Sequence, residues 1–63
     1  MIRVNDEEIQ FDSTIMELII SLDLRPGTCA VLVNGQIVKK EEWDSYYLKN
    51  NDYVEIVSFV GGG

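Results

Sequence analysis

Three consecutive glycines, Gly61, Gly62 and Gly63, are the residues of this 63-residue sequence best suited to chemistry. They follow an apolar, strand-like run, 53–60. Glycine has no Cβ, so its backbone can enter a narrow slot that is closed to other residues. An activated glycyl carbonyl also has no side chain to shield it from a nucleophile. We expect this glycine tail to offer the Gly63 carboxylate to another protein as a substrate, against the alternative of a merely flexible chain end.

Size and composition restrict the possible classes of function. A chain of 7.2 kDa forms one domain, here 1–60 followed by the tail 61–63, and domains this small bury only ~60% of their unfolded surface. The content of 46% hydrophobic and 25% charged residues is typical of a globular protein. The sequence has no histidine and one cysteine, Cys29, which excludes an intrachain disulfide, hydrolytic triads and metal–histidine chemistry. We therefore expect no enzyme, no metal site and no permanently bound cofactor.

The charge balance indicates the kind of partner. Five Lys and Arg against eleven Asp and Glu give a formal net charge of −6. This charge opposes nucleic-acid phosphates and anionic membranes and favours a basic protein surface. No segment resembles a signal peptide or a membrane span, so the cytoplasm is the expected compartment.

The first half of the sequence predicts a β-hairpin and then a helix. Apolar residues alternate with polar ones on either side of an expected turn, 5–8; they are Ile2, Val4, Ile9 and Phe11. One helical face follows at i, i+3, i+4, i+7 spacing: Ile15, Leu18, Ile19 and Leu22. Thr14 and Glu17 fit a capping box, and Pro26 and Gly27 predict a helix end near Asp23.

The second half predicts another hairpin and a last strand. The runs 29–33 and 36–38 flank Asn34-Gly35, which suits a type I′ turn. A short helical turn at 39–44 should place Trp43 on the core, and a turn at 50–52 precedes the last strand, 53–60. One helix packed on one small mixed sheet is an α+β fold of the β-grasp arrangement. Because the last strand is so apolar, we expect it to pair inside the sheet, since at an exposed edge it would promote aggregation.

Residue parity in the strands predicts a docking face. Alternate side chains point to opposite faces of a sheet. If Val31, Val33, Val54 and Ile56 face the helix, then a second set faces away and leads toward the tail: Leu32, Val57 and Phe59, with Ala30 and Glu55. Scattered exposed apolar residues are normal, but a cluster beside a reactive end favours partner docking.

Other candidate sites have simpler interpretations. Cys29 could relay sulfur, but its place in a β-branched strand favours a buried, chemically silent thiol. The aromatic side chains lack interleaved basic residues, so core and rim packing is expected for Trp43, Tyr46, Tyr47 and Tyr53. The acidic run 6–8 is expected to be a solvated hairpin turn rather than a cation site.

Four segments in this order resemble the ThiS family of sulfur-carrier proteins, which are ubiquitin-like β-grasp proteins of thiamine biosynthesis. The segments are 33–38 (VNGQIV), Trp43, 51–56 (NDYVEI) and 59–63 (FVGGG). The resemblance covers essentially the whole chain. Two loop positions depart from the family pattern, with Lys39-Lys40 in place of Pro-Arg and Asn51-Asp52 in place of Gly-Asp.

The resemblance implies a carrier cycle in which the catalytic groups belong to partners. An adenylating enzyme of ThiF type, similar to the ubiquitin-activating enzymes, would use ATP and magnesium to adenylate Gly63. Sulfur from a persulfide donor would displace AMP, and the resulting thiocarboxylate would serve a thiazole synthase of ThiG type. The alternatives are a carrier for molybdopterin synthesis, a ubiquitin-like protein modifier, and a β-grasp binding module.

Overall fold

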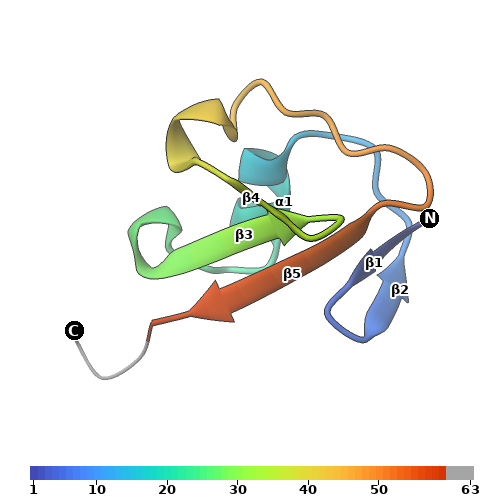
Figure 1. Ribbon diagram of the computed structural model, residues 1–63, viewed down its shortest axis with the longest axis horizontal. Coiled ribbons are helices and arrows are strands. Elements are labelled where there is room, and N and C mark those ends of the chain that lie inside the picture. The colour runs from blue at the N-terminus through green and yellow to red at the C-terminus, as the bar shows by residue number, and fades with distance from the viewer. Residues whose placement is uncertain (60–63) are drawn as a thin grey trace.

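In the part of the chain that the structure describes, one α-helix packs against one face of a five-stranded mixed sheet (Figure 1). The computed structural model of the chain describes residues 1–59. Along the chain the elements are β1 (Ile2–Val4), β2 (Glu7–Ile9), α1 (Ile15–Ser21), the 3₁₀ turn η1 (Pro26–Thr28), β3 (Cys29–Val33), β4 (Gln36–Val38), the 3₁₀ turn η2 (Lys40–Glu42) and β5 (Tyr53–Ser58). The strand order is β2-β1-β5-β3-β4. The predicted β-grasp arrangement is therefore confirmed, with the last strand at the centre of the sheet.

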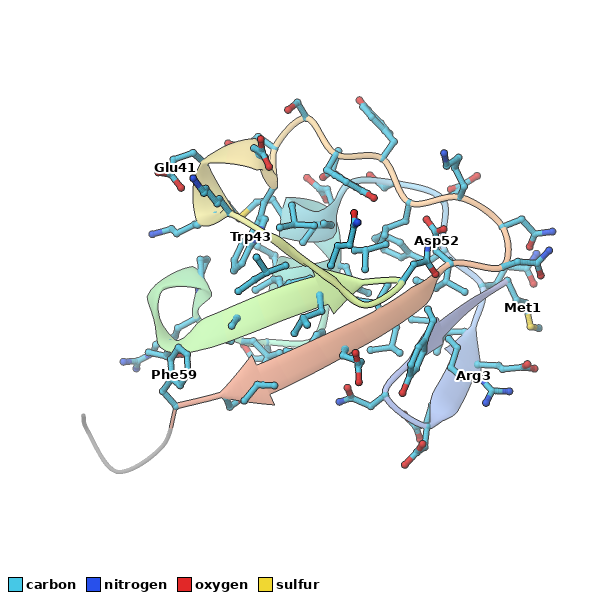
Figure 2. The ribbon with its side chains drawn as sticks, viewed as in Figure 1. Met1, Arg3, Glu41, Trp43, Asp52 and Phe59 are labelled. Atoms are coloured by element: carbon cyan, nitrogen blue, oxygen red, sulfur yellow. The ribbon has the colours of Figure 1, made fainter. Side chains whose placement is uncertain are left out.

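The core lies between the helix and the sheet and is apolar. Its residues come from strands β1, β3, β4 and β5, from one face of the helix, and from the segment after β4. They are Ile2, Val4, Ile15, Leu18, Ile19, Cys29, Val31, Val33, Val38, Trp43, Leu48 and Val54. Trp43 is 1% exposed, and its indole Nε1–H donates to the Val38 carbonyl over 2.9 Å. The short turn η2 thus places the indole on the core, as the sequence predicted (Figure 2).

The hairpin turns use residues that tolerate positive φ angles. Asn34 and Gly35 have φ values of 53° and 86°, as a type I′ turn requires. The first hairpin turns more tightly than predicted, because Asn5, at φ 55°, lets the chain reverse at Asn5-Asp6. Glu7 and Glu8 consequently belong to β2, so the expectation that they lie in the turn was wrong.

The helix begins as predicted and ends slightly earlier. Thr14 is the N-cap, and its Oγ1 accepts a hydrogen bond from the Glu17 amide at 3.2 Å. Leu22 is the C-cap and 41% exposed, so its assignment to the buried face was wrong. Asp23 takes the left-handed conformation, with φ 61°, and turns the chain away. Pro26 and Gly27 then form part of η1.

The last strand is also shorter than predicted. β5 ends at Ser58, and Phe59 follows it with its amide donating to the Thr28 carbonyl at 2.7 Å. Val60, which was assigned to the strand, lies outside the described residues. Within residues 1–59, no helix is long and apolar enough to cross a membrane.

Candidate functional site

The central strand β5 leads directly to the predicted reactive residues. It pairs in parallel with β1 and antiparallel with β3, so its direction is fixed from both sides. Phe59 stands at its carboxyl end, far from the chain start at Met1 (Figure 2). Gly61, Gly62 and Gly63 lie outside the described residues, and the role predicted for them stays a prediction.

The start of β5 is held by a polar network around Asp52. This carboxylate is 7% exposed; Oδ1 accepts from Asn34 Nδ2 at 3.0 Å, and Oδ2 accepts from the Lys49 amide at 2.8 Å. Asn34 Oδ1 in turn accepts from the Tyr53 amide at 3.0 Å. The Asp52 carbonyl also accepts from the Arg3 amide at 2.9 Å. One buried residue thereby joins β1, the β3–β4 turn and β5 at a single point.

Strand pairing arranges the predicted docking face on the side of the sheet away from the helix. Ala30 lies opposite Val57, and Leu32 lies opposite Glu55 on β5 and Ile37 on β4. Leu32 is half-buried, while Val57 and Phe59 are 50% and 59% exposed.

The parity assignment behind this face agrees with the burial pattern. On the helix side Val31, Val33 and Val54 are all buried, and Ile56 is half-buried. The sequence argument missed Ile37, which is 67% exposed and enlarges the apolar face. Its register across the Asn34-Gly35 turn was the signal that could have found it, since residue 37 must lie opposite residue 32. Docking of a partner on this face stays a prediction.

The Cys29 thiol is buried, as expected. It is 8% exposed, its Sγ donates to the Arg25 carbonyl at 3.6 Å, and burial raises the pKa of the thiol. A raised pKa lowers the thiolate fraction at neutral pH, and the thiolate is the nucleophilic form. This favours a structural role over sulfur relay.

Two of the four aromatic residues pack at the core or its rim. Trp43 is buried, and Tyr46 is half-buried against the core. Tyr47 and Tyr53 are 65% and 38% exposed, so the expectation of packing was wrong for these two. Within residues 1–59, no group of three or more carboxylates or thiols is placed to hold a metal ion.

Comparison with known proteins gives a consistent result over the full length. The model of the ThiS family matches residues 2–63. The chain is 33% identical over 66 residues to the sulfur carrier protein ThiS of Bacillus subtilis (strain 168), covering 100% of both chains. It is 31% identical over 64 residues to the sulfur carrier protein ThiS of Escherichia coli (strain K12), covering 98% of this chain and 97% of that protein. The crystal structure of the thiamine biosynthesis protein ThiS from Geobacter metallireducens superposes with a TM-score of 0.81 at 27% identity, covering 98% of this chain and 97% of that one.

Proposed function

The chain belongs to the ThiS family, and on this premise we propose that it is a sulfur carrier of thiamine biosynthesis, acted on by partner enzymes. The observation that carries the proposal is the family match, which runs through the glycine tail to residue 63. Two relatives named sulfur carrier protein ThiS align with this chain over nearly their entire length.

In the proposed cycle the Gly63 carboxylate is the reacting group. A carboxylate is a poor electrophile until one of its oxygens becomes part of a leaving group. An adenylating enzyme of ThiF type, using ATP and magnesium, converts it to an acyl-adenylate and releases pyrophosphate. The outer sulfur of a persulfide donor then displaces AMP and forms an acyl persulfide. A second thiol of the donor cleaves the S–S bond of this intermediate and is itself oxidised to a disulfide. The released product is a thiocarboxylate, a soft nucleophile that passes its sulfur to a thiazole synthase of ThiG type.

The described residues support this role by holding a rigid platform behind the tail. β5 is paired on both sides at its start and fixed there by Asp52. The apolar face of Leu32, Ile37, Val57 and Phe59 adjoins the end of the same strand. Exposed apolar patches of this kind are typical of protein–protein contacts.

Intact-mass spectrometry tests the proposal. The protein is incubated with its adenylating enzyme, ATP, magnesium and a persulfide donor. The expected result is a mass gain equal to replacement of one oxygen by sulfur, located on Gly63 by fragmentation. Gly62→Trp should lower the rate of this gain by about a hundredfold, because small misplacements of a reacting carbon have effects of that size. Gly62→Ala, the smaller change, serves as its matched comparison.

Two results would contradict the proposal. One is the absence of any mass gain with authentic partner enzymes. The other is a wild-type rate for a protein extended by one residue beyond Gly63, because such a protein has no carboxylate at that glycine.

A further inference from the structure

The carboxyl-terminal half of β5 has an open backbone edge on its β1 side. The register with β1 covers Tyr53 and Val54 and stops there. One step further the Asn5 side chain takes the place of a strand, since its Oδ1 accepts from the Ile56 amide at 3.0 Å. Figure 1 shows the β1–β2 hairpin beside the start of β5 and no strand beside the arrowhead on that side.

The direction of the Ser58 amide follows from its neighbours. The Phe59 amide donates to β3, through the Thr28 carbonyl, whereas the Ile56 amide points to the β1 side. Amides two residues apart along a strand point the same way. The Ser58 N–H therefore points to the open side, and Ser58 is exposed. Among residues 1–59, no hydrogen-bond partner is found for this amide.

A groove runs along this open edge. It lies between the first hairpin, the segment after the helix, and β5. Its apolar lining residues are Val4, Leu22, Leu24 and Ile56. Leu22 is 41% exposed, Leu24 and Ile56 are half-buried, and Val4 is buried. Ser58 lines the groove as well, so the unpaired amide and the apolar surface belong to one depression.

The charged residues that line this groove have one sign. They are Asp6 and Glu7, and both are exposed. No Lys or Arg is among the lining residues. A complementary occupant carries a basic side chain for the carboxylates and an apolar side chain for the leucines, and it presents an extended backbone to Ser58.

We propose that this groove, the Ser58 groove, binds an extended, basic segment of the adenylating protein, which adds to the sheet as a strand along β5. The inference rests on the proposed function, since it concerns the protein that receives the tail. The groove ends at Ser58, which precedes the glycine tail by only a short stretch of chain. A strand paired there would fix the direction in which the tail enters the enzyme. The Ser58 groove and the apolar docking face that includes Leu32 thus engage a partner from opposite sides of β5.

Charge reversal tests the acidic side of the Ser58 groove. The dissociation constant for the adenylating enzyme is measured by titration calorimetry for the wild type, Asp6→Lys/Glu7→Lys and Glu41→Lys/Glu42→Lys. The control pair is exposed on η2, on the far side of the sheet from the first hairpin (Figure 2), and changes the net charge equally. We expect about tenfold weaker binding for the first variant, less salt dependence of its affinity, and a near wild-type constant for the second.

Backbone pairing has an independent readout. Hydrogen exchange at the Ser58 amide should be fast in the free protein and slow in the complex. Ser58→Pro removes this N–H at an unpaired position and should weaken binding, whereas Ser58→Ala keeps it and should not. If Ser58→Pro does not fold, the exchange measurement on the wild type still decides the point.

The outcomes separate this inference from the proposed function. Wild-type sulfur loading together with unaltered Ser58 exchange in the complex overturns the Ser58 groove and leaves the carrier role intact. Equal weakening by the two charge-reversal pairs also overturns it, because the effect would then be general electrostatics. Absence of both binding and sulfur loading in the wild type overturns both proposals.

Discussion

The two ends of β5 are held in different ways. At Tyr53 the strand is paired on both sides, and Asp52 ties it to two other segments with a nearly buried carboxylate. At Ser58 it is paired only with β3 among the described residues. Backbone groups are unpaired at the Ser58 end of β5, whereas the Tyr53 end is paired on both sides and held by Asp52. This difference indicates that stability is concentrated at the start of the strand. The far end therefore keeps backbone groups that a partner could pair with, as proposed above.

The strongest test of this comparison places a charge near each end of β5, on opposite faces of the sheet. Val54→Glu places an unpaired charge at a position that is 0% exposed, and we expect it to unfold the domain, costing about 4 kcal/mol or more. Circular dichroism and urea denaturation measure the effect. The matched change Val57→Glu, on the other face at 50% exposure, should leave a folded protein. The reverse result would show that the face assignment is inverted.

Asp52→Ala tests the anchored end. The change leaves the Lys49 amide and the Asn34 side chain without their acceptor, and we expect the free energy of unfolding to fall by about 2–3 kcal/mol. Asp44→Ala, at an exposed position, is the control and should change stability by less than ~0.5 kcal/mol. Equal effects in chemical denaturation would mean that the network around Asp52 does not anchor β5.

Neutral substitutions on the docking face test whether the surface that leads to the Ser58 end of β5 binds a partner. Leu32→Gln and Phe59→Gln should each weaken binding to the adenylating enzyme by about tenfold, since apolar anchors dominate most interfaces. Glutamine is used because a glutamate at 32 would lie directly opposite Glu55 and repel it. Titration calorimetry measures the affinity, and unchanged melting temperatures show that the fold is intact. Normal binding by both variants would place recognition elsewhere.

The smallest effect is expected at Cys29. Cys29→Ala should cost about 1 kcal/mol of stability and leave sulfur loading unchanged. Burial raises the pKa of this thiol in the folded protein, so the unfolded chain loses the proton first as pH rises. Wild-type stability should therefore decline above the ordinary thiol pKa of about 8.5, and the alanine variant should lack that part of the decline. Loss of sulfur transfer in a folded Cys29→Ala protein would instead show that the thiol participates.

Local sequence signals predicted most of the fold. The Asn34-Gly35 turn and the bounds of β3 and β4 agree with the structure, because turn chemistry fixes register within a hairpin. Thr14 was predicted correctly as the N-cap because a capping box is also defined by residues close together in the sequence. The parity of β5 followed from alternation alone, and so did the exposure of Val57.

Features created by contacts between distant segments could not be predicted. Asp52 looked like an ordinary turn residue, and its burial depends on Asn34, 18 positions away. Leu22 continued the apolar helical period, yet the helix ends at Ser21 and leaves it exposed at the Ser58 groove. The groove exists because β1 pairs in parallel with the start of β5. No local sequence pattern specifies that pairing.

The parallel pairing of β1 with β5 also governs how the molecule comes to be folded. The bond between Asn5 and Ile56 joins residues 51 positions apart, so the sheet closes across most of the chain. Folding rates fall as such non-local contacts increase, since the entropy of loop closure is lost before the contacts form. During synthesis the other strands emerge first and have no central strand to join. We therefore expect the nascent chain to stay unfolded until β5 has left the ribosome, after which the whole domain forms in one cooperative step.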